Sequence, residues 1–82
     1  MRWTQFMYTR SNVHPEKPGF WQSDDGEYEF VRAGNVWQIH RTDSYLCHND
    51  SLIGSAATLD AAFRLAARHY VTPMGQWSIT HV

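Results

Sequence analysis

Two segments that alternate polar and apolar residues, joined by a glycine turn, constrain this chain more than any other feature. Residues 27–32 and 36–41 each alternate with a period of two, and Ala33-Gly34-Asn35 lies between them. Such alternation is typical of a strand that buries one face, and glycine suits the turn. The sequence therefore predicts a β-hairpin with four side chains directed into a core. These are Tyr28, Phe30, Trp37 and Ile39.

An amphipathic helix is predicted to begin after Thr58. The Thr58 hydroxyl can accept a hydrogen bond from an unpaired N–H of the first turn, and Asp60 lies where the helix dipole favours negative charge. Arg64 and Arg68 follow Asp60 at i, i+4 spacing on an exposed face, and Pro73 ends the helix. Apolar residues recur on another face, which we expect to pack. They are Leu59, Ala62, Phe63, Ala66 and Tyr70.

The remaining segments predict further short strands. Residues 3–10 are rich in aromatic residues and Thr, which favours a first strand. Residues 11–19 contain two prolines and a glycine, so we expect a surface loop that cannot pair along a sheet. Residues 20–22, 45–48 and 77–82 predict additional strands. The predicted order is β-β-β-β-α-β, an α+β fold with an antiparallel sheet of four to five short strands and one α-helix on a face.

Length and composition predict one small soluble domain spanning residues 1–82. A chain of 82 residues is too short for two separate cores. Its 43% hydrophobic residues, four each of Trp, Tyr and Phe, and net charge of −1 argue against disorder. There is no run of about 18 apolar residues and no signal-peptide pattern, so we expect a cytoplasmic protein without a membrane partner.

The sequence offers little that resembles catalytic or metal-binding chemistry. Cys47-His48 is the obvious place to look, but adjacent residues on a strand point to opposite faces. Structural zinc sites use paired short ligand spacings, and none occurs here. Phosphate-binding and nucleophile-elbow glycine motifs are also missing from the sequence. We therefore expect no catalytic residues, no metal and no cofactor, and a structural role for the single cysteine.

Charged and aromatic residues near the predicted hairpin indicate a protein-binding surface. Acidic residues surround Gly26, where they form either an ordinary hairpin tip or a negative patch that meets a basic partner surface. Arg, Trp and Tyr dominate interface hot spots, and six of the seven basic residues are Arg. The predicted partner-binding residues are Trp21, Asp24, Asp25, Glu27, Glu29, Arg64 and Arg68. A strand edge could also support a homodimer.

Residues 34–41, the pair Ile53-Gly54 and the Ala-rich segment 58–67 resemble the AP2-like DNA-binding pattern. That family reads DNA from a three-stranded sheet with a Trp-bearing strand, a strand ending in an apolar-Gly pair, and an Ala-rich helix after a Thr. The resemblance implies a nucleic-acid-binding module that uses the sheet face away from the helix. The residues expected on that face are Arg32, Gln38, His40 and Arg41.

In size and overall character the chain also resembles anti-CRISPR proteins, the small phage-encoded inhibitors of bacterial defence systems. The resemblance implies that the chain occupies a nucleic-acid-binding or assembly surface of a CRISPR-Cas effector subunit. A net charge of −1 favours such a protein partner over nucleic acid, because DNA-reading proteins neutralise several phosphates with Lys and Arg. The leading hypothesis is therefore a non-enzymatic interaction module acting as an inhibitor, and the AP2-like module is the alternative.

Overall fold

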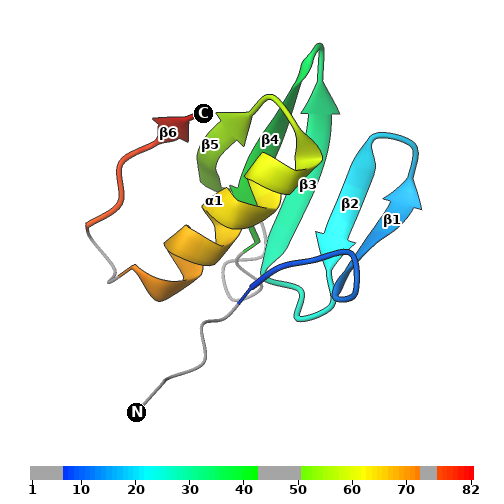
Figure 1. Cartoon of the computed structure of the whole chain (residues 1–82), viewed down its shortest axis with the longest axis horizontal. Helices are drawn as coiled ribbons and strands as arrows, with labels where there is room; N and C mark the ends of the chain where they lie inside the picture. The colour runs from blue at the N-terminus through cyan, green and yellow to red at the C-terminus, as the bar shows by residue number, and fades with distance from the viewer. Residues whose placement is uncertain (1–6, 43–50, 73–75) are drawn as a thin grey trace.

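A computed structural model of the chain describes residues 7–42, 51–72 and 76–82. Within these ranges, one helix lies against a single six-stranded sheet (Figure 1). The elements are β1 (Val13–Lys17), β2 (Phe20–Ser23), β3 (Tyr28–Ala33), β4 (Val36–Arg41), β5 (Ser51–Ala56), α1 (Leu59–Val71) and β6 (Thr80–His81). The strands lie in the sheet in sequence order, which confirms the predicted α+β class with a helix packed on the sheet.

The pairing differs from the prediction in two respects. The sheet has six strands among the described residues, where four to five were expected. The first four pairings are antiparallel, but β6 pairs with β5 in parallel. The parallel pairing follows from the connection, because α1 crosses the sheet between β5 and β6 and returns the chain to the same end. The predicted closing strand of residues 77–82 is reduced to the two residues of β6.

The central hairpin formed by β3 and β4 confirms the strongest sequence prediction. Tyr28, Phe30 and Ile39 are fully buried, and Trp37 is half-buried against the same core. Gly34 in the turn adopts a φ of 65°, a conformation that glycine reaches without strain. Alternation with a period of two therefore identified the buried face correctly.

The helix begins as predicted, and it packs across β3, β4 and β5 (Figure 1). The Thr58 side chain accepts a hydrogen bond of 3.1 Å from the Ala61 N–H. Tyr70 was expected to pack but is 49% exposed. It lies in the last turn, where its ring meets the edge of Tyr8. Leu65 is buried instead, and it comes so close to Gly54 of β5 that a Cβ there would lie 2.7 Å from the Leu65 Cδ2.

The prediction of a loop over residues 11–19 was wrong, because Val13–Lys17 forms β1. This strand pairs Val13 with Ser23 of β2 and stands at the edge of the sheet. Pro15 is tolerated at an edge, and the register shifts between Pro15 and Lys17. The expected first strand at residues 3–10 was also wrong for residues 7–10, which are not a strand. The rest of that segment and the predicted strand 45–48, with Cys47, lie outside the described residues.

Residues 7–9, before β1, lie on the helix side of the sheet. Tyr8 is only 4% exposed there, and its ring packs edge-on against Tyr28 at a centroid distance of 5.2 Å. Tyr8 therefore extends the core beside α1, on the side of the sheet that the helix covers (Figure 1). The helix of the described region is too short and too polar to cross a membrane.

Candidate functional site

The turn between β2 and β3 is organised around the Asp25 carboxylate. Asp25 accepts hydrogen bonds from the Tyr8 hydroxyl at 2.8 Å, the Ser23 hydroxyl at 2.6 Å and the Glu27 N–H at 2.9 Å. Gly26 beside it has a φ of 73°, which closes the turn. The Asp25 side chain therefore connects Tyr8, which precedes β1, to the turn between β2 and β3.

The pKa shifts of Asp25 and Tyr8 favour the hydrogen bond between them. Partial burial by itself would raise the pKa of Asp25, but the hydrogen bonds from Ser23, Glu27 and Tyr8 outweigh it and hold the pKa below its usual value. Burial raises the pKa of Tyr8, and the hydrogen bond to Asp25 raises it further. Tyr8 thus remains a neutral donor to an ionised carboxylate, which is a strong form of hydrogen bond.

The other predicted acidic residues have separate partners. Asp24 lies 2.9 Å from the Nε2 of His14, and Glu27 lies 2.6 Å from the Nη2 of Arg41. Glu29 is half-buried on β3, where it stands opposite His40 of β4. By strand alternation it points to the other side of the sheet from Phe30. Asp24, Asp25 and Glu27 are therefore each engaged by a partner within the fold.

A second hydrogen-bonded pair joins the helix to the sheet. The hydroxyl of the buried Tyr28 lies 2.7 Å from the Nδ1 of His69, whose ring packs edge-on against Trp77. Burial lowers the pKa of His69, and the Arg41 guanidinium lowers it further. Burial also raises the pKa of Tyr28 to about 12. A neutral His69 therefore accepts from, or donates to, a neutral Tyr28, and the contact fixes the end of α1.

The four residues of the alternative nucleic-acid surface do not share a face, which corrects that expectation. Gln38 and His40 lie on the sheet face away from the helix, and the His40 Nε2 is 3.3 Å from the Gln38 Oε1. Arg32 stands opposite Trp37 and Arg41 opposite Tyr28, and each guanidinium lies over the ring of its neighbour. Strand alternation places these two arginines on the helix side.

The Trp21 side chain packs between β2, on which it lies, and the helix. Its ring meets the edge of Phe63 at a centroid distance of 6.2 Å, and the Arg10 guanidinium lies 5.4 Å from the ring centroid on the outside. Trp21 is half-buried and packs against the core. Trp21, which was predicted to bind a partner, therefore contributes to the packing of β2 against α1.

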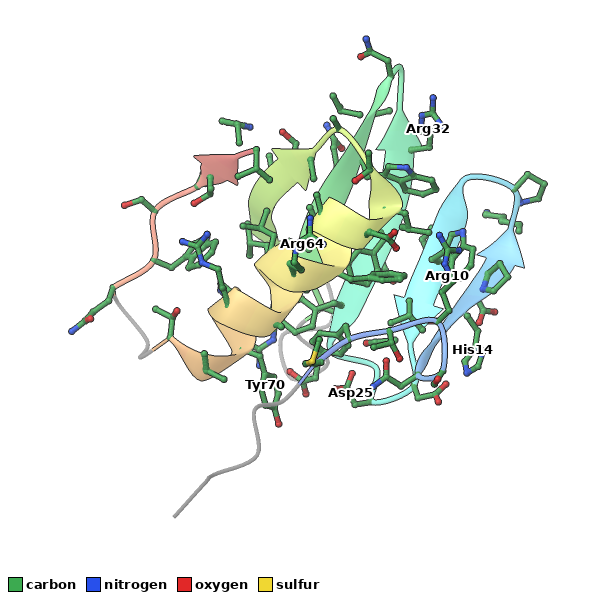
Figure 2. All side chains as sticks on the ribbon, in the orientation of Figure 1. Arg10, His14, Asp25, Arg32, Arg64 and Tyr70 are labelled. Carbon is green, nitrogen blue, oxygen red and sulfur yellow. The ribbon has the colours of Figure 1, made fainter. Side chains whose placement is uncertain are left out.

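Arg64 and Arg68 are both exposed on α1, as the i, i+4 spacing predicted, and Figure 2 shows the position of Arg64 on the helix. Asp60, one turn before Arg64, lies 3.6 Å from Arg10 instead. Among the described residues neither Arg64 nor Arg68 forms an ion pair. The Arg68 guanidinium lies 5.9 Å from the centroid of the Trp77 ring. This aromatic contact does not neutralise the charge of Arg68.

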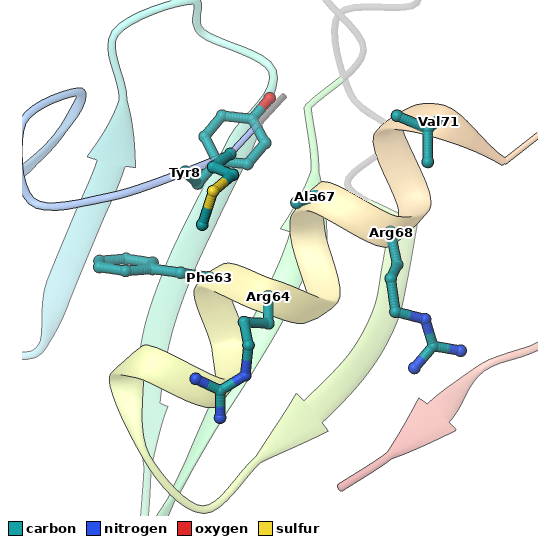
Figure 3. A pocket seen from close by; sticks show the side chains of 7 residues that line it. Tyr8, Phe63, Arg64, Ala67, Arg68 and Val71 are labelled. Atoms are coloured by element: carbon teal, nitrogen blue, oxygen red, sulfur yellow. The ribbon is translucent and has the colours of Figure 1, made fainter. Parts of the chain in front are cut away.

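A groove of about 260 Å³ lies between residues 7–8 and the helix, and we call it the helix groove (Figure 3). Its apolar lining consists of Met7, Tyr8, Phe63, Ala67 and Val71, and Arg64 and Arg68 complete it. Met7 is 56% exposed and Val71 59% exposed, so the groove continues into an apolar surface. No local sequence pattern indicates this groove, because it is formed where residues 7–8 approach the helix.

The free edge formed by β1 bears on the predicted homodimer. Pro15 has no N–H to donate to a further strand, and the register shift before Lys17 disturbs the edge. A homodimer paired through a strand edge stays a prediction.

Within the described residues, fold and surface together define a small α+β domain with one helix and an arginine-flanked apolar groove beside it. In the described ranges no group of three or more His, Cys, Asp or Glu side chains is placed to hold a metal ion. Comparisons of the chain with protein-family models, with curated proteins and with solved structures found no match.

Proposed function

We propose that this chain is a non-enzymatic protein-interaction module that inhibits a larger host nucleoprotein complex by direct binding, as anti-CRISPR proteins inhibit CRISPR-Cas effectors. The observation that carries the proposal is the surface around the helix groove. Met7 and Val71 are exposed apolar side chains there, and Arg64 and Arg68 are exposed beside them. Methionine and arginine are enriched at protein interfaces relative to the rest of protein surfaces.

The distribution of basic residues supports a protein partner over nucleic acid. Arg10 pairs with Asp60, and Arg41 pairs with Glu27. Arg32 donates a hydrogen bond from its Nε to the Gly34 carbonyl. The sheet face with Gln38 and His40 also bears Glu29, whose negative charge would oppose a phosphate backbone. In this proposal the protein acts in the cytoplasm of the host cell.

The test is affinity capture from a lysate of the host, with bound proteins identified by mass spectrometry. Three immobilised proteins are compared: the unaltered chain, Arg64→Glu/Arg68→Glu, and Arg32→Glu. Arg32 is exposed and does not line the helix groove, and it lies at the opposite end of the sheet from Asp25 (Figure 2). The Arg32→Glu variant therefore controls for the effect of reversing an arginine charge outside the groove. We expect the unaltered chain and Arg32→Glu to enrich the same protein, and the double variant to lose it.

A gel-shift titration with duplex DNA and RNA at two salt concentrations decides between the two classes of partner. The proposal expects no shift at concentrations where the captured protein binds. Tight binding that weakens steeply with added salt would contradict the proposal and favour the AP2-like alternative, because counterion release is characteristic of phosphate contacts. Equal capture by all three immobilised proteins would contradict the choice of surface.

A further inference from the structure

We infer that the helix groove binds an acidic polypeptide segment of the partner that carries a bulky apolar side chain. This inference rests on the proposed function and assigns the chemistry of the ligand. The apolar side chain enters beside Met7 and Tyr8, and carboxylates of the same segment meet Arg64 and Arg68.

The size and lining of the groove set the apolar part of the ligand. Its volume is about 260 Å³, and five of its seven lining residues are Met7, Tyr8, Phe63, Ala67 and Val71. Drug-sized molecules occupy pockets of about 300–1,000 Å³. A groove slightly below that range suits one or two apolar side chains of a peptide better than a cofactor.

The groove is built from side chains that are already fixed. Phe63 packs edge-on against the buried Phe30 at a centroid distance of 5.2 Å. Tyr8 is held by its hydrogen bond to Asp25 and by the ring of Tyr28. A preformed floor avoids much of the conformational entropy that a partner would otherwise have to overcome on binding. Asp25 therefore acts as a positioning residue for one wall of the groove.

The two arginines set the charge of the ligand. Arg64 and Arg68 are one turn apart on α1, so their side chains are neighbours and their charges repel each other. Asp60 could have offset that repulsion from one turn before, but it pairs with Arg10. An anionic ligand would relieve the repulsion, and Arg is well suited to hold a carboxylate through two parallel hydrogen bonds.

The geometry also orders the two parts of the ligand. Figure 3 shows Tyr8 on one side of α1, while the guanidinium groups of Arg64 and Arg68 extend toward the other. The two arginines border a second hollow of about 220 Å³, lined also by Ala61, Leu65 and Val82. A bound segment would therefore cross the helix, with its apolar side chain near Tyr8 and its carboxylates on the far side of Arg64 and Arg68.

A phage-displayed library of random dodecapeptides, selected on the immobilised full chain, tests this assignment. We expect the enriched peptides to share acidic residues next to a bulky apolar residue. Synthetic versions should bind at least about tenfold more weakly to Arg64→Glu/Arg68→Glu and to Ala67→Glu, and equally well to Arg32→Glu. Replacing the acidic residues of a peptide by their amides should weaken it by a similar factor.

Three outcomes would overturn the assignment. The first is enrichment of peptides without acidic residues, or of none. The second is equal binding to the double variant, with folding of every variant checked by circular dichroism. The third is a dimer of the unaltered chain, measured by light scattering, that Arg64→Glu/Arg68→Glu dissociates, because the groove would then belong to a second copy. Lysate capture that survives in the double variant would overturn this assignment while leaving a protein partner in place.

Discussion

The acidic turn, residues 24–27, carries three carboxylates and the outer side of α1 carries two arginines, and only the carboxylates are paired within the described fold. In the turn, Asp25 accepts from three donors, and Asp24 and Glu27 each face a basic side chain. On α1, Arg64 and Arg68 form no ion pair with a described residue. Charges that the fold has already paired stabilise it, whereas charges left exposed beside an apolar groove are available to a partner.

The largest expected effect is loss of partner binding when the exposed charges are reversed. Arg64→Glu/Arg68→Glu places like charges against an acidic ligand, which costs several kcal/mol at an interface, so the affinity should fall by about 100-fold or more. The thermal midpoint should change little, because both side chains are exposed. Isothermal titration with the captured partner measures the first quantity, and calorimetric unfolding measures the second.

The opposite pattern is expected for Asp25→Ala. Removing this carboxylate leaves the hydroxyls of Tyr8 and Ser23 without their acceptor, which should lower the free energy of unfolding by about 1–2 kcal/mol. Urea unfolding followed by tryptophan fluorescence measures the change. Partner affinity should weaken less than in the arginine double variant, because Asp25→Ala affects the groove only by loosening the Tyr8 side chain. A fully stable Asp25→Ala protein would contradict the structural role of the turn.

The pH dependence of stability should separate the turn from the end of the helix. The pKa of His69 is lowered in the folded state, so the unfolded chain takes up a proton first and stability falls as pH drops below about 6.5. The pKa of Asp25 is also lowered, so its contribution is complete above about pH 4 and is lost as pH falls through the folded value. Urea unfolding at a series of pH values should show both losses.

Histidine variants assign the upper of these two pH ranges. His69→Gln should remove the loss just below pH 6.5, whereas His81→Gln, at an exposed position beside Ser55, should retain it. The idea fails if the two variants keep the same pH profile as the unaltered chain.

The smallest effect is expected for the neighbour of Asp25. Asp24→Ala removes an exposed pair with His14, and such pairs contribute about 0–1 kcal/mol. The free energy of unfolding should therefore fall clearly less than in Asp25→Ala, although both changes delete one carboxylate from the same turn. Equal losses in the two variants would show that the turn is stabilised by its total charge and not by the hydrogen bonds of Asp25.

Local patterns predicted the parts of the fold that local forces determine. The hairpin of β3 and β4 was visible in its alternation, and α1 in the Thr58 cap and its spacing. β1 was missed because Pro15 argues against a strand everywhere except at an edge. β5 was missed because Gly54 interrupts the apolar alternation, and a side chain at Gly54 would collide with Thr80 of β6 and Leu65 of α1.

The candidate site could be predicted only in part for the same reason. The exposure of Arg64 and Arg68 followed from helical spacing. The engagement of Asp25 and the groove itself depend on a hydrogen bond between Tyr8 and Asp25, 17 residues apart, which no sequence pattern records. From charge alone, the acidic residues and the arginines were both predicted to bind a partner. Their contacts distinguish them, because the turn carboxylates of Asp24, Asp25 and Glu27 have partners within the fold and the two helix arginines form no ion pair with a described residue.

A nitrogen-15 heteronuclear NMR titration of the full chain with an enriched acidic peptide tests the central claim most directly. If the helix groove is the binding surface, the amide signals of Met7 and of Phe63 to Val71 will shift with a common affinity, and those of β1 and β2 will stay in place. Shifts concentrated at Asp24 to Glu27, with the helix signals unchanged, would contradict the account.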